Sequence, residues 1–443
     1  MVVLFRRGTE SPDPVVQEVP VVQPPAGGGD ALTIQQVVGG RMVRAFFQPV
    51  IHLDSGEVVG YEALARGPVG TAFESPGPMF AAAGAAGLAW ELDLVAHAAA
   101  FKAAVEAKVH PSAALFINVA TPSASGPVPE DLMGALALAR ARLRVFMEMS
   151  ERSLSENAEA TMLGIERART AGWGIALDNV GVTAASLALM PFAYPDVVKI
   201  DVSLVHEQTH PYAPRVMSTV TAHAERSGAS IMAVGIESEA HARTARGLGA
   251  VLGQGYHFGR PLPLTEQLVP REPQHQIHLI AQRPAVSGKT TPFTLATQDR
   301  PPLSVADQVL ATLAGHLEQR AGLDPDPMVV LACLPKNQMI SGEPLAILQN
   351  MARNASFIGA LIGQLPPAAI PDVHLVRLDD NEPMRRELTL ILLGPHYSAL
   401  LTARRQASVT ERGGYAYRLV YDRLTVEQAA GVILRRINKA SLT

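Results

Sequence analysis

Eight short apolar, β-rich runs recur along roughly the first 260 residues, and each ends in or near a polar or charged residue. Stretches rich in Ala and Leu, long enough for helices, lie between most of them, as at 96–107 and 158–170. Strand alternating with helix implies parallel pairing, and eight such units suggest a β/α barrel. The eight runs are 46–51, 58–64, 114–119, 145–149, 174–180, 196–201, 230–237 and 251–258.

The first connection differs from the others. Only residues 52–57 separate the first two runs, whereas a parallel crossover needs about a dozen residues. Asp54-Ser55-Gly56 is typical of a turn. We therefore expect the first strand to be antiparallel to the second, which makes the barrel irregular.

The pattern divides the chain into four parts. Residues 1–30 are rich in Pro and Gly and are expected to form a disordered tail, and residues 31–265 form the barrel. Residues 266–302 show no sustained periodicity and are interpreted as a linker. Residues 303–443 predict a smaller α/β domain with helices at 306–320 and 346–358 and strands at 327–334 and 388–393. A capping-box pattern at Thr425-Val-Glu-Gln428 predicts a final helix to about Lys439.

Composition narrows the class of protein. The 443 residues allow two or three domains, and 37 basic against 41 acidic side chains exclude the cationic excess of a nucleic-acid binder. The single cysteine, Cys333, allows no intrachain disulfide. The longest apolar stretch, 79–90, is about half of the roughly 20 residues that span a bilayer, so we expect a cytoplasmic protein without a membrane span.

Polar side chains follow most of the expected strands, where the active site of a β/α barrel lies. Carboxylate and amide oxygens suit Mg²⁺ or Mn²⁺, and Lys199, one of only six lysines, adds positive charge where a phosphate could bind. Any one of these residues could be a solvated strand end, but together they indicate a site. They are Glu62, Arg66, Asn118, Glu148, Glu151, Asp178, Asn179, Lys199, Asp201, Glu237 and Gln254.

As a set, these segments resemble the motif series of the EAL family across about residues 31–265. They are Gln48-Pro49, Glu62-Ala-Leu64 with Arg66, Asn118, Glu148-x-x-Glu151, Asp178-Asn-x-Gly181, Lys199-Ile-Asp201, Gly235-Ile-Glu237 and Gln254-Gly-Tyr-x-Phe-Gly-Arg-Pro261. The resemblance implies a TIM-like (β/α)8 barrel with an antiparallel first strand. It also implies that the protein binds cyclic di-GMP, hydrolyses it to pGpG with two Mg²⁺ or Mn²⁺ ions when intact, and dimerises through the barrel.

The resemblance also implies a role for each residue. Glu62, Asn118, Glu148 and Asp178 would hold the first metal. Lys199 would position the water and the phosphate, with Glu151 and Glu237 also in the catalytic set and Glu151 anchoring the loop after Asp178. Gln48, Arg66 and Gln254 would contact the dinucleotide.

Two positions depart from the family pattern. The paired aspartates appear as Asp178-Asn179, and the usual Ala-Glu-Gly-Val-Glu segment appears with Val234 in place of its first glutamate. Two dications about 3.5 to 4 Å apart need negative ligands, so we expect one retained Mg or Mn site and a second that is weak or absent. The leading hypothesis is a cyclic di-GMP receptor with little or no hydrolysis. A slow phosphodiesterase and a ligand-free interaction module are the alternatives.

The C-terminal region carries no catalytic constellation that the sequence indicates. Its apolar patterning resembles the DICT sensory domain over about 130 residues. That resemblance implies a signal input with an unknown ligand or partner.

Overall fold

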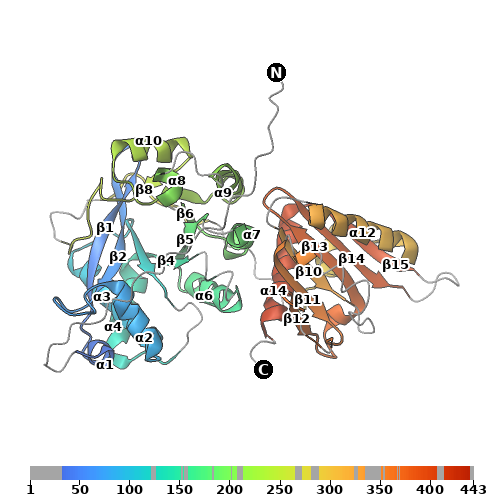
Figure 1. Ribbon diagram of the computed structural model, residues 1–443, viewed down its shortest axis with the longest axis horizontal. Coiled ribbons are helices and arrows are strands. Elements are labelled where there is room, and N and C mark those ends of the chain that lie inside the picture. Colours follow the sequence, from blue (N-terminus) through green and yellow to red (C-terminus); the bar gives the residue numbers. More distant parts are fainter. Residues whose placement is uncertain are drawn as a thin grey trace, which may run out of the picture.

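The computed structural model describes residues 32–120, 126–150, 153, 158–181, 184–200, 202–206, 213–264, 272–280, 289–323, 328–334, 351–352, 355–366, 368, 370–406 and 414–439. Two bodies follow one another along the chain (Figure 1). The first is a closed eight-stranded barrel and the second is built on a seven-stranded sheet. The tail predicted at residues 1–30 lies outside the described residues.

The barrel strands follow the eight predicted runs closely. They are β1 (Arg44–His52), β2 (Val58–Arg66), β3 (Ala114–Asn118), β4 (Arg144–Ser150), β5 (Gly174–Val180), β6 (Val197–Ile200), β7 (Ser230–Ala233) and β8 (Leu252–Gly253). Strand β1 is antiparallel to both β2 and β8, and the remaining neighbours pair in parallel. The irregular barrel with an antiparallel first strand is therefore confirmed.

Helices surround the barrel. They are α1 (Ile34–Gly39), α2 (Pro76–Ala85), α3 (Ala89–Glu106), α4 (Glu130–Arg142), α6 (Ala158–Thr170), α7 (Ala184–Ala193), α8 (Val202–His206), α9 (Ala213–Ser227) and α10 (Glu239–Gly247). The helices predicted at 96–107 and 158–170 correspond to α3 and α6. No described helix has the length and the apolarity that a membrane crossing requires.

Apolar side chains fill the interior of the barrel below the site. Because side chains alternate between the two faces of a strand, every second residue points into the barrel. Phe116, Phe146 and Met232 belong to one buried cluster there, and the Phe116 and Phe146 rings stack with centroids 5.0 Å apart. Ile277, which is not on any barrel strand, belongs to the same cluster and is 3% exposed.

Residues 272–280, within the segment predicted as a linker, pack against the barrel at several points. The Glu57 carboxylate accepts the backbone N–H groups of Gln274 and His275 at 2.6 and 3.2 Å. The fully buried Asp196 accepts the N–H of Ile280 at 2.7 Å. These bonds hold Ile277 in the apolar interior, so this stretch is part of the barrel's packing.

The C-terminal sheet has the strand order β12-β11-β10-β13-β14-β15-β9. Its strands are β9 (Leu303–Val305), β10 (Met328–Cys333), β11 (Ala355–Ile362), β12 (His374–Arg377), β13 (Glu387–Leu393), β14 (Ser398–Arg405) and β15 (Tyr415–Val420). With it lie α11 (Pro292–Ala296), α12 (Asp307–Leu323), the 3-10 turn η1 (Pro383–Arg386) and α14 (Arg423–Lys439). The sheet is mixed, with β10, β11 and β12 parallel.

Three predictions for this domain need correction or completion. The helix predicted at 346–358 is wrong at its C-terminal end, because Ala355 to Ile358 lie in strand β11; residues 346–350 lie outside the described part. Strands β9, β11, β12, β14 and β15 were not predicted. The last helix begins at Arg423, and its cap is Asp422, whose carboxylate accepts the Thr425 N–H and hydroxyl at 3.0 and 2.8 Å.

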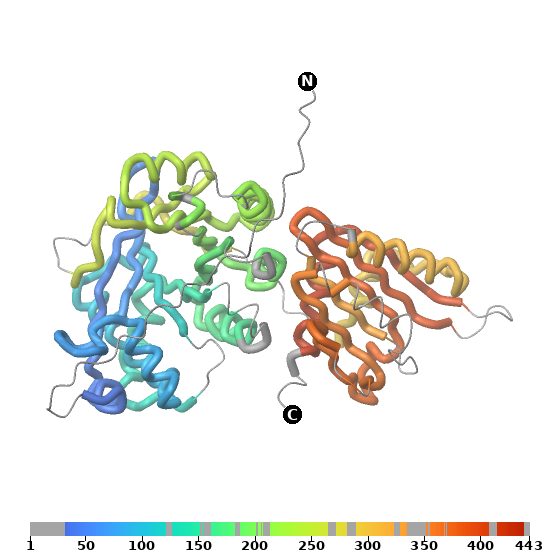
Figure 2. Tube along the Cα trace, in the orientation of Figure 1, coloured from blue at the N-terminus to red at the C-terminus, as the bar shows by residue number. Residues whose placement is uncertain are grey.

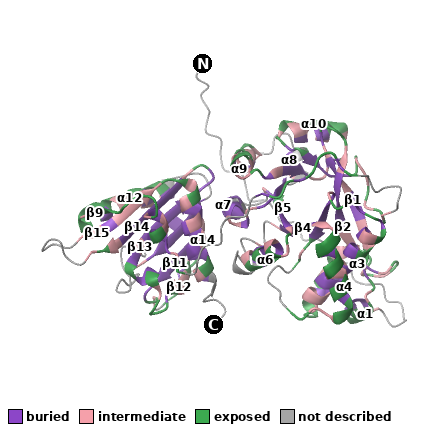
Figure 3. Cartoon of the chain, turned by 180° about the vertical axis from the view of Figure 1, so that it is seen from behind, coloured by how far each residue is buried: buried purple, intermediate pink, exposed green. Residues whose placement is uncertain are grey.

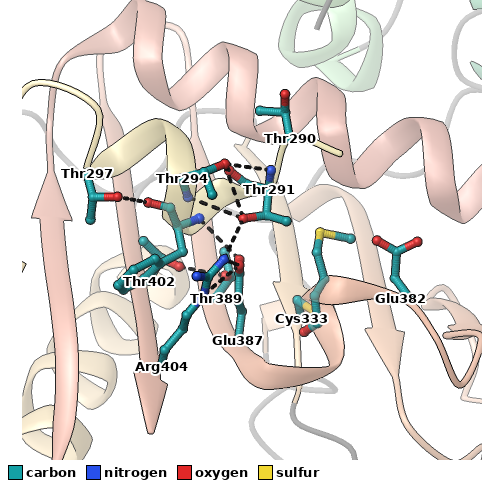
Figure 4. A network of polar contacts seen from close by, with 12 residues as sticks. Thr290, Thr291, Thr294, Thr297, Cys333, Glu382, Glu387, Thr389, Thr402 and Arg404 are labelled. Carbon is teal, nitrogen blue, oxygen red and sulfur yellow. Dashed lines mark hydrogen bonds and ion pairs between the residues drawn. The ribbon is translucent and has the colours of Figure 1, made fainter. Parts of the chain in front are cut away.

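A polar network anchors α11 on the C-terminal sheet (Figure 4). Glu387 is fully buried and accepts the Phe293 N–H at 3.1 Å and the Arg404 Nε–H at 3.0 Å. Thr291 accepts the Thr294 N–H at 3.2 Å and caps α11. The 289–302 part of the predicted linker is thereby tied to the second domain.

The two bodies share an apolar interface. Helix α7 of the barrel contacts β10, β11 and α14, and α14 also contacts α6. One buried cluster contains Leu189 and Met190 of α7 together with Leu331, Leu361 and Ile433 of the second domain. The tube view and the burial colours show α7 between the barrel and the sheet (Figures 2 and 3).

Candidate functional site

One inward-facing residue on each barrel strand, or directly after it, forms a layer above the apolar interior. On the parallel strands these residues come two positions after a buried apolar residue or small residue, as Glu148 follows Phe146 and Asn118 follows Phe116. The layer consists of Gln48, Glu62, Asn118, Glu148, Asp178, Lys199, Val234 and Gln254. Seven of these residues are polar.

Lys199 lies at the centre of the layer. Its Nζ is 2.7 Å from Glu148 Oε1, 3.1 Å from Glu62 Oε2 and 3.6 Å from Asp178 Oδ1. Burial lowers the pKa of Lys199, but the three carboxylates outweigh burial and raise that pKa well above its usual value. The ammonium therefore stays charged.

The two buried glutamates differ in their electrostatics. Burial, aided by the charge of Glu62, raises the pKa of Glu148 well above its usual value despite the opposing effect of Lys199. Burial also raises the pKa of Glu62, but the Lys199 charge and the hydrogen bonds from Asn118 and Gln254 outweigh it, and the pKa is lowered. Glu62 is therefore the better-stabilised carboxylate of the pair.

Asp178 and Asn179 lie at the end of β5. Asn179 has a left-handed backbone (φ 57°), which Asn tolerates better than most residues. Its Nδ2 donates to Asp178 Oδ2 at 3.0 Å. An amide at this position thus stabilises Asp178 where a second carboxylate would repel it.

A pocket of about 450 Å³ opens onto the layer. Glu62, Asn118, Glu148, Asp178 and Asn179 line its polar side, and residues of β1, β2, α2 and α3 line an apolar side. Within the described chain, Glu148 Oε2 is buried and has no hydrogen-bond partner. A buried carboxylate oxygen without a partner is costly, so this atom indicates a place for a cation or a donor group.

The remaining predicted residues are distributed around the rim. Arg66 lies over the Phe46 ring, with Cζ 5.6 Å from its centroid, and donates to the Ala65 carbonyl at 2.8 Å. Glu237 is exposed after β7. Glu151 lies outside the described residues. Val234 is half-buried and packs on the apolar interior.

Sequence reasoning missed three residues near the site. The His97 Nε2 lies 2.8 Å from the Asn118 carbonyl oxygen, and the buried Asp93 accepts the Ala120 N–H at 3.4 Å. Ser150 lines the pocket two residues after Glu148. Asp93 and His97 stand four residues apart on the apolar helix α3, and that spacing was the available signal.

The donor set fits one divalent cation. When all three are ionised, Glu62, Glu148 and Asp178 carry three negative charges against the single positive charge of Lys199, and Asn118 adds an amide oxygen, so a cation of charge two would balance the group. Across the described residues, no three His, Cys, Asp or Glu groups converge in a ready ligand geometry. Lys199 lies among the carboxylates instead.

The barrel is similar in sequence to two proteins named as cyclic di-GMP phosphodiesterases. The probable cyclic di-GMP phosphodiesterase PdeB of Escherichia coli is 27% identical over 239 residues, which cover 53% of this chain and 46% of PdeB. The cyclic di-GMP phosphodiesterase RocR of Pseudomonas aeruginosa is 32% identical over 121 residues, which cover 27% of this chain and 31% of RocR. The chain thus spans less than half the length of these relatives.

Solved structures give a weaker likeness. A calcium and cyclic di-GMP complex of BlrP1 from Klebsiella pneumoniae is 27% identical with a TM-score of 0.44, covering 50% of this chain and 56% of BlrP1. The FimX EAL domain from Pseudomonas aeruginosa bound to cyclic di-GMP is 24% identical with a TM-score of 0.45, covering 53% and 97%. The fold assignment rests on the strand pairing. The model of the EAL domain matches residues 33–261, more than half of the chain, and the chain therefore belongs to the EAL domain family.

Proposed function

We propose that the barrel binds cyclic di-GMP at the rim pocket and hydrolyses it slowly or not at all. The observation that carries this proposal is that the inward-facing layer combines charged side chains with the apolar Val234. Glu62, Glu148 and Asp178 have carboxylate oxygens within 3.6 Å of the Lys199 ammonium. The carboxylates are suited to bind a cation, and the ammonium is suited to bind a phosphate. Val234 in the same layer packs against apolar side chains.

One metal ion would be held by Glu62, Asn118, Glu148 and Asp178. A bound Mg²⁺ or Mn²⁺ polarises a phosphate and lowers the pKa of water, and hydrolysis by two ions needs both of them about 3.5 to 4 Å apart. Val234 has no oxygen, and Asn179 lacks the charge of a second aspartate. The chain's own residues would therefore bind and orient the dinucleotide, with Lys199 holding positive charge beside its phosphate.

The retained ion-pair layer favours a slow phosphodiesterase as the second candidate. In this case one well-held ion and Lys199 would support residual hydrolysis to pGpG.

A dimer is also part of the proposal. Because α6 and α7 are covered by the chain's own second domain, such a dimer would use another face of the barrel.

Calorimetric titration with cyclic di-GMP tests the binding. We expect saturable binding by the wild-type chain in Mn²⁺, and weaker binding by Arg66→Ala, because Arg66 would contact the dinucleotide. Arg140→Ala, on the exposed side of α4, is the matched control and should bind as the wild type does. Absence of binding by the wild-type chain would favour the ligand-free interaction module.

A further inference from the structure

Two glutamines connect the rim of the barrel to Glu62. Gln254 Nε2 donates to Glu62 Oε2 at 2.7 Å and to Gln48 Oε1 at 3.2 Å. Gln48 Nε2 in turn donates to the Gly259 carbonyl at 3.0 Å. These residues lie on β1, on β2 and in the segment after β8, so the chain of bonds joins three separate parts of the barrel.

The groups at the two ends of this chain of hydrogen bonds determine which atom of each glutamine donates and which accepts. An ionised carboxylate and a backbone carbonyl can only accept hydrogen bonds. Glu62 therefore requires the amide nitrogen of Gln254 to face it, and Gly259 requires the amide nitrogen of Gln48. The Gln48 oxygen is then left to accept from Gln254, which is the bond observed.

Both glutamines are buried, and neither lines the described pocket. Gln48 is 9% exposed and Gln254 is 4% exposed. Their polar groups are directed at Glu62, at each other and at Gly259. This arrangement differs from the direct dinucleotide contact that the family resemblance implies.

The segment after β8 provides a firm anchor. A Cβ on Gly255 would lie 2.0 Å from the Ile236 carbonyl oxygen, so only glycine allows this backbone approach. The Gly259 N–H donates to the Gly255 carbonyl at 3.2 Å, and Leu262 and Phe47 exchange two backbone hydrogen bonds. Gly259 therefore presents its carbonyl to Gln48 from a fixed position.

We propose that Gln48 and Gln254 are positioning residues that hold the Glu62 carboxylate for metal binding, with Gln254 in direct contact and Gln48 acting through it. The proposal deepens the proposed function and rests on it for the role of Glu62. Groups that orient a metal ligand typically change metal affinity about 10- to 100-fold when they are removed.

The test compares Gln48→Met, Gln254→Met and the double variant, in which methionine keeps the length of glutamine and removes its hydrogen bonds. Mn²⁺ titration by calorimetry should show about a 10- to 100-fold loss for Gln254→Met, a smaller loss for Gln48→Met, and no further loss in the double variant. Gln308→Met, exposed on α12, should bind Mn²⁺ as the wild type does.

A second titration, with cyclic di-GMP in EDTA, separates positioning from direct contact. We expect both glutamine variants to keep the metal-free affinity of the wild type, whereas Arg66→Ala loses it. Additive Mn²⁺ losses, or a loss of metal-free dinucleotide affinity with Mn²⁺ affinity intact, would overturn the proposal.

Unfolding in EDTA needs no ligand and supplies a third measurement. The effects of Gln48→Met and Gln254→Met on the free energy of unfolding should be non-additive, and strict additivity would count against the chain of bonds. If the wild type bound Mn²⁺ but no cyclic di-GMP, the proposed function would fail while the Mn²⁺ and unfolding measurements still judged the positioning role.

Discussion

Lys199 is the residue on which the site depends most, because it is the cation among three carboxylates. Removing one partner of a buried ion pair leaves uncompensated charge, which costs more than the pair itself contributes. Lys199 is 2% exposed and its nearest partner, Glu148, is 1% exposed, so this ion pair is shielded from water. A cation among these carboxylates, whether the ammonium or a metal ion, therefore stabilises the layer.

Lys199→Met should consequently lower the free energy of unfolding by about 3 to 5 kcal/mol in EDTA. Mn²⁺ should raise the melting temperature of this variant more than that of the wild type, because the carboxylates then lack their other cation. Urea denaturation and thermal scans measure both effects. Lys102→Met, at an exposed pair with Glu106, should change stability by less than about 0.5 kcal/mol; an equal loss in both variants would contradict this account.

A second residue-scale prediction concerns the cap of the last helix. Asp422→Ala should cost about 0.5 to 2 kcal/mol near pH 7. Hydrogen bonds from the Thr425 backbone and side chain lower the pKa of Asp422, so this stabilisation is present above the unfolded-state pKa and is lost as the pH falls through the folded-state pKa. The difference between wild type and variant should shrink in acid, and the exposed Asp299→Ala is the control. A difference that grew in acid would assign the effect to another cause.

At the scale of elements, residues 272–280 contribute to the barrel through one buried side chain. Ile277→Ala removes apolar contacts inside the barrel and should lower the free energy of unfolding by about 2 to 5 kcal/mol. Its neighbour Leu279 is 41% exposed, so Leu279→Ala should stay within about 0.5 kcal/mol. Chemical denaturation compares them, and equal effects would mean that Ile277 does not fill the interior.

The barrel strands could be predicted from the sequence because each combines an apolar run with a polar end. Phe146 and Glu148, or Phe116 and Asn118, occupy successive inward positions on one strand, and the two-residue period of a strand makes such pairs visible in the sequence. The Gln48–Gln254–Glu62 chain could not be predicted in this way. Its members are up to 206 positions apart, and only barrel closure brings them together.

The second domain was harder to predict for a physical reason. Strand β14 is buried along most of its length, so it lacks alternation, and a short apolar run of this kind cannot be told from a buried helix by its pattern alone. Residues 355–358, at the start of β11, were included in the helix predicted at 346–358. The capping-box pattern at Thr425 gave the right helix, but Asp422, three residues earlier, makes the cap.

For the whole molecule, the apolar cluster shared by α7 and the C-terminal sheet predicts one cooperative unfolding transition. Both tryptophans, Trp90 and Trp173, lie in the barrel, so their fluorescence reports on the barrel alone. Glu387→Ala leaves Arg404 without its buried partner in the second domain and should shift the tryptophan transition together with the circular-dichroism transition.

Leu303→Ala, on the exposed edge strand β9, should leave both transitions in place. If Glu387→Ala moved the circular-dichroism signal and left the tryptophan signal unchanged, the two domains would be energetically independent. Large apolar interfaces between domains favour the coupled outcome.

The central claim, binding of cyclic di-GMP with little or no turnover, is tested most directly by the single-turnover rate of pGpG formation in Mn²⁺. The wild-type chain should form pGpG slowly or not at all at a dinucleotide concentration that saturates it. The double variant Asn179→Asp with Val234→Glu should be faster, because it restores two carboxylates to the rim. Fast turnover by the wild type, or no gain in the double variant, would contradict the account.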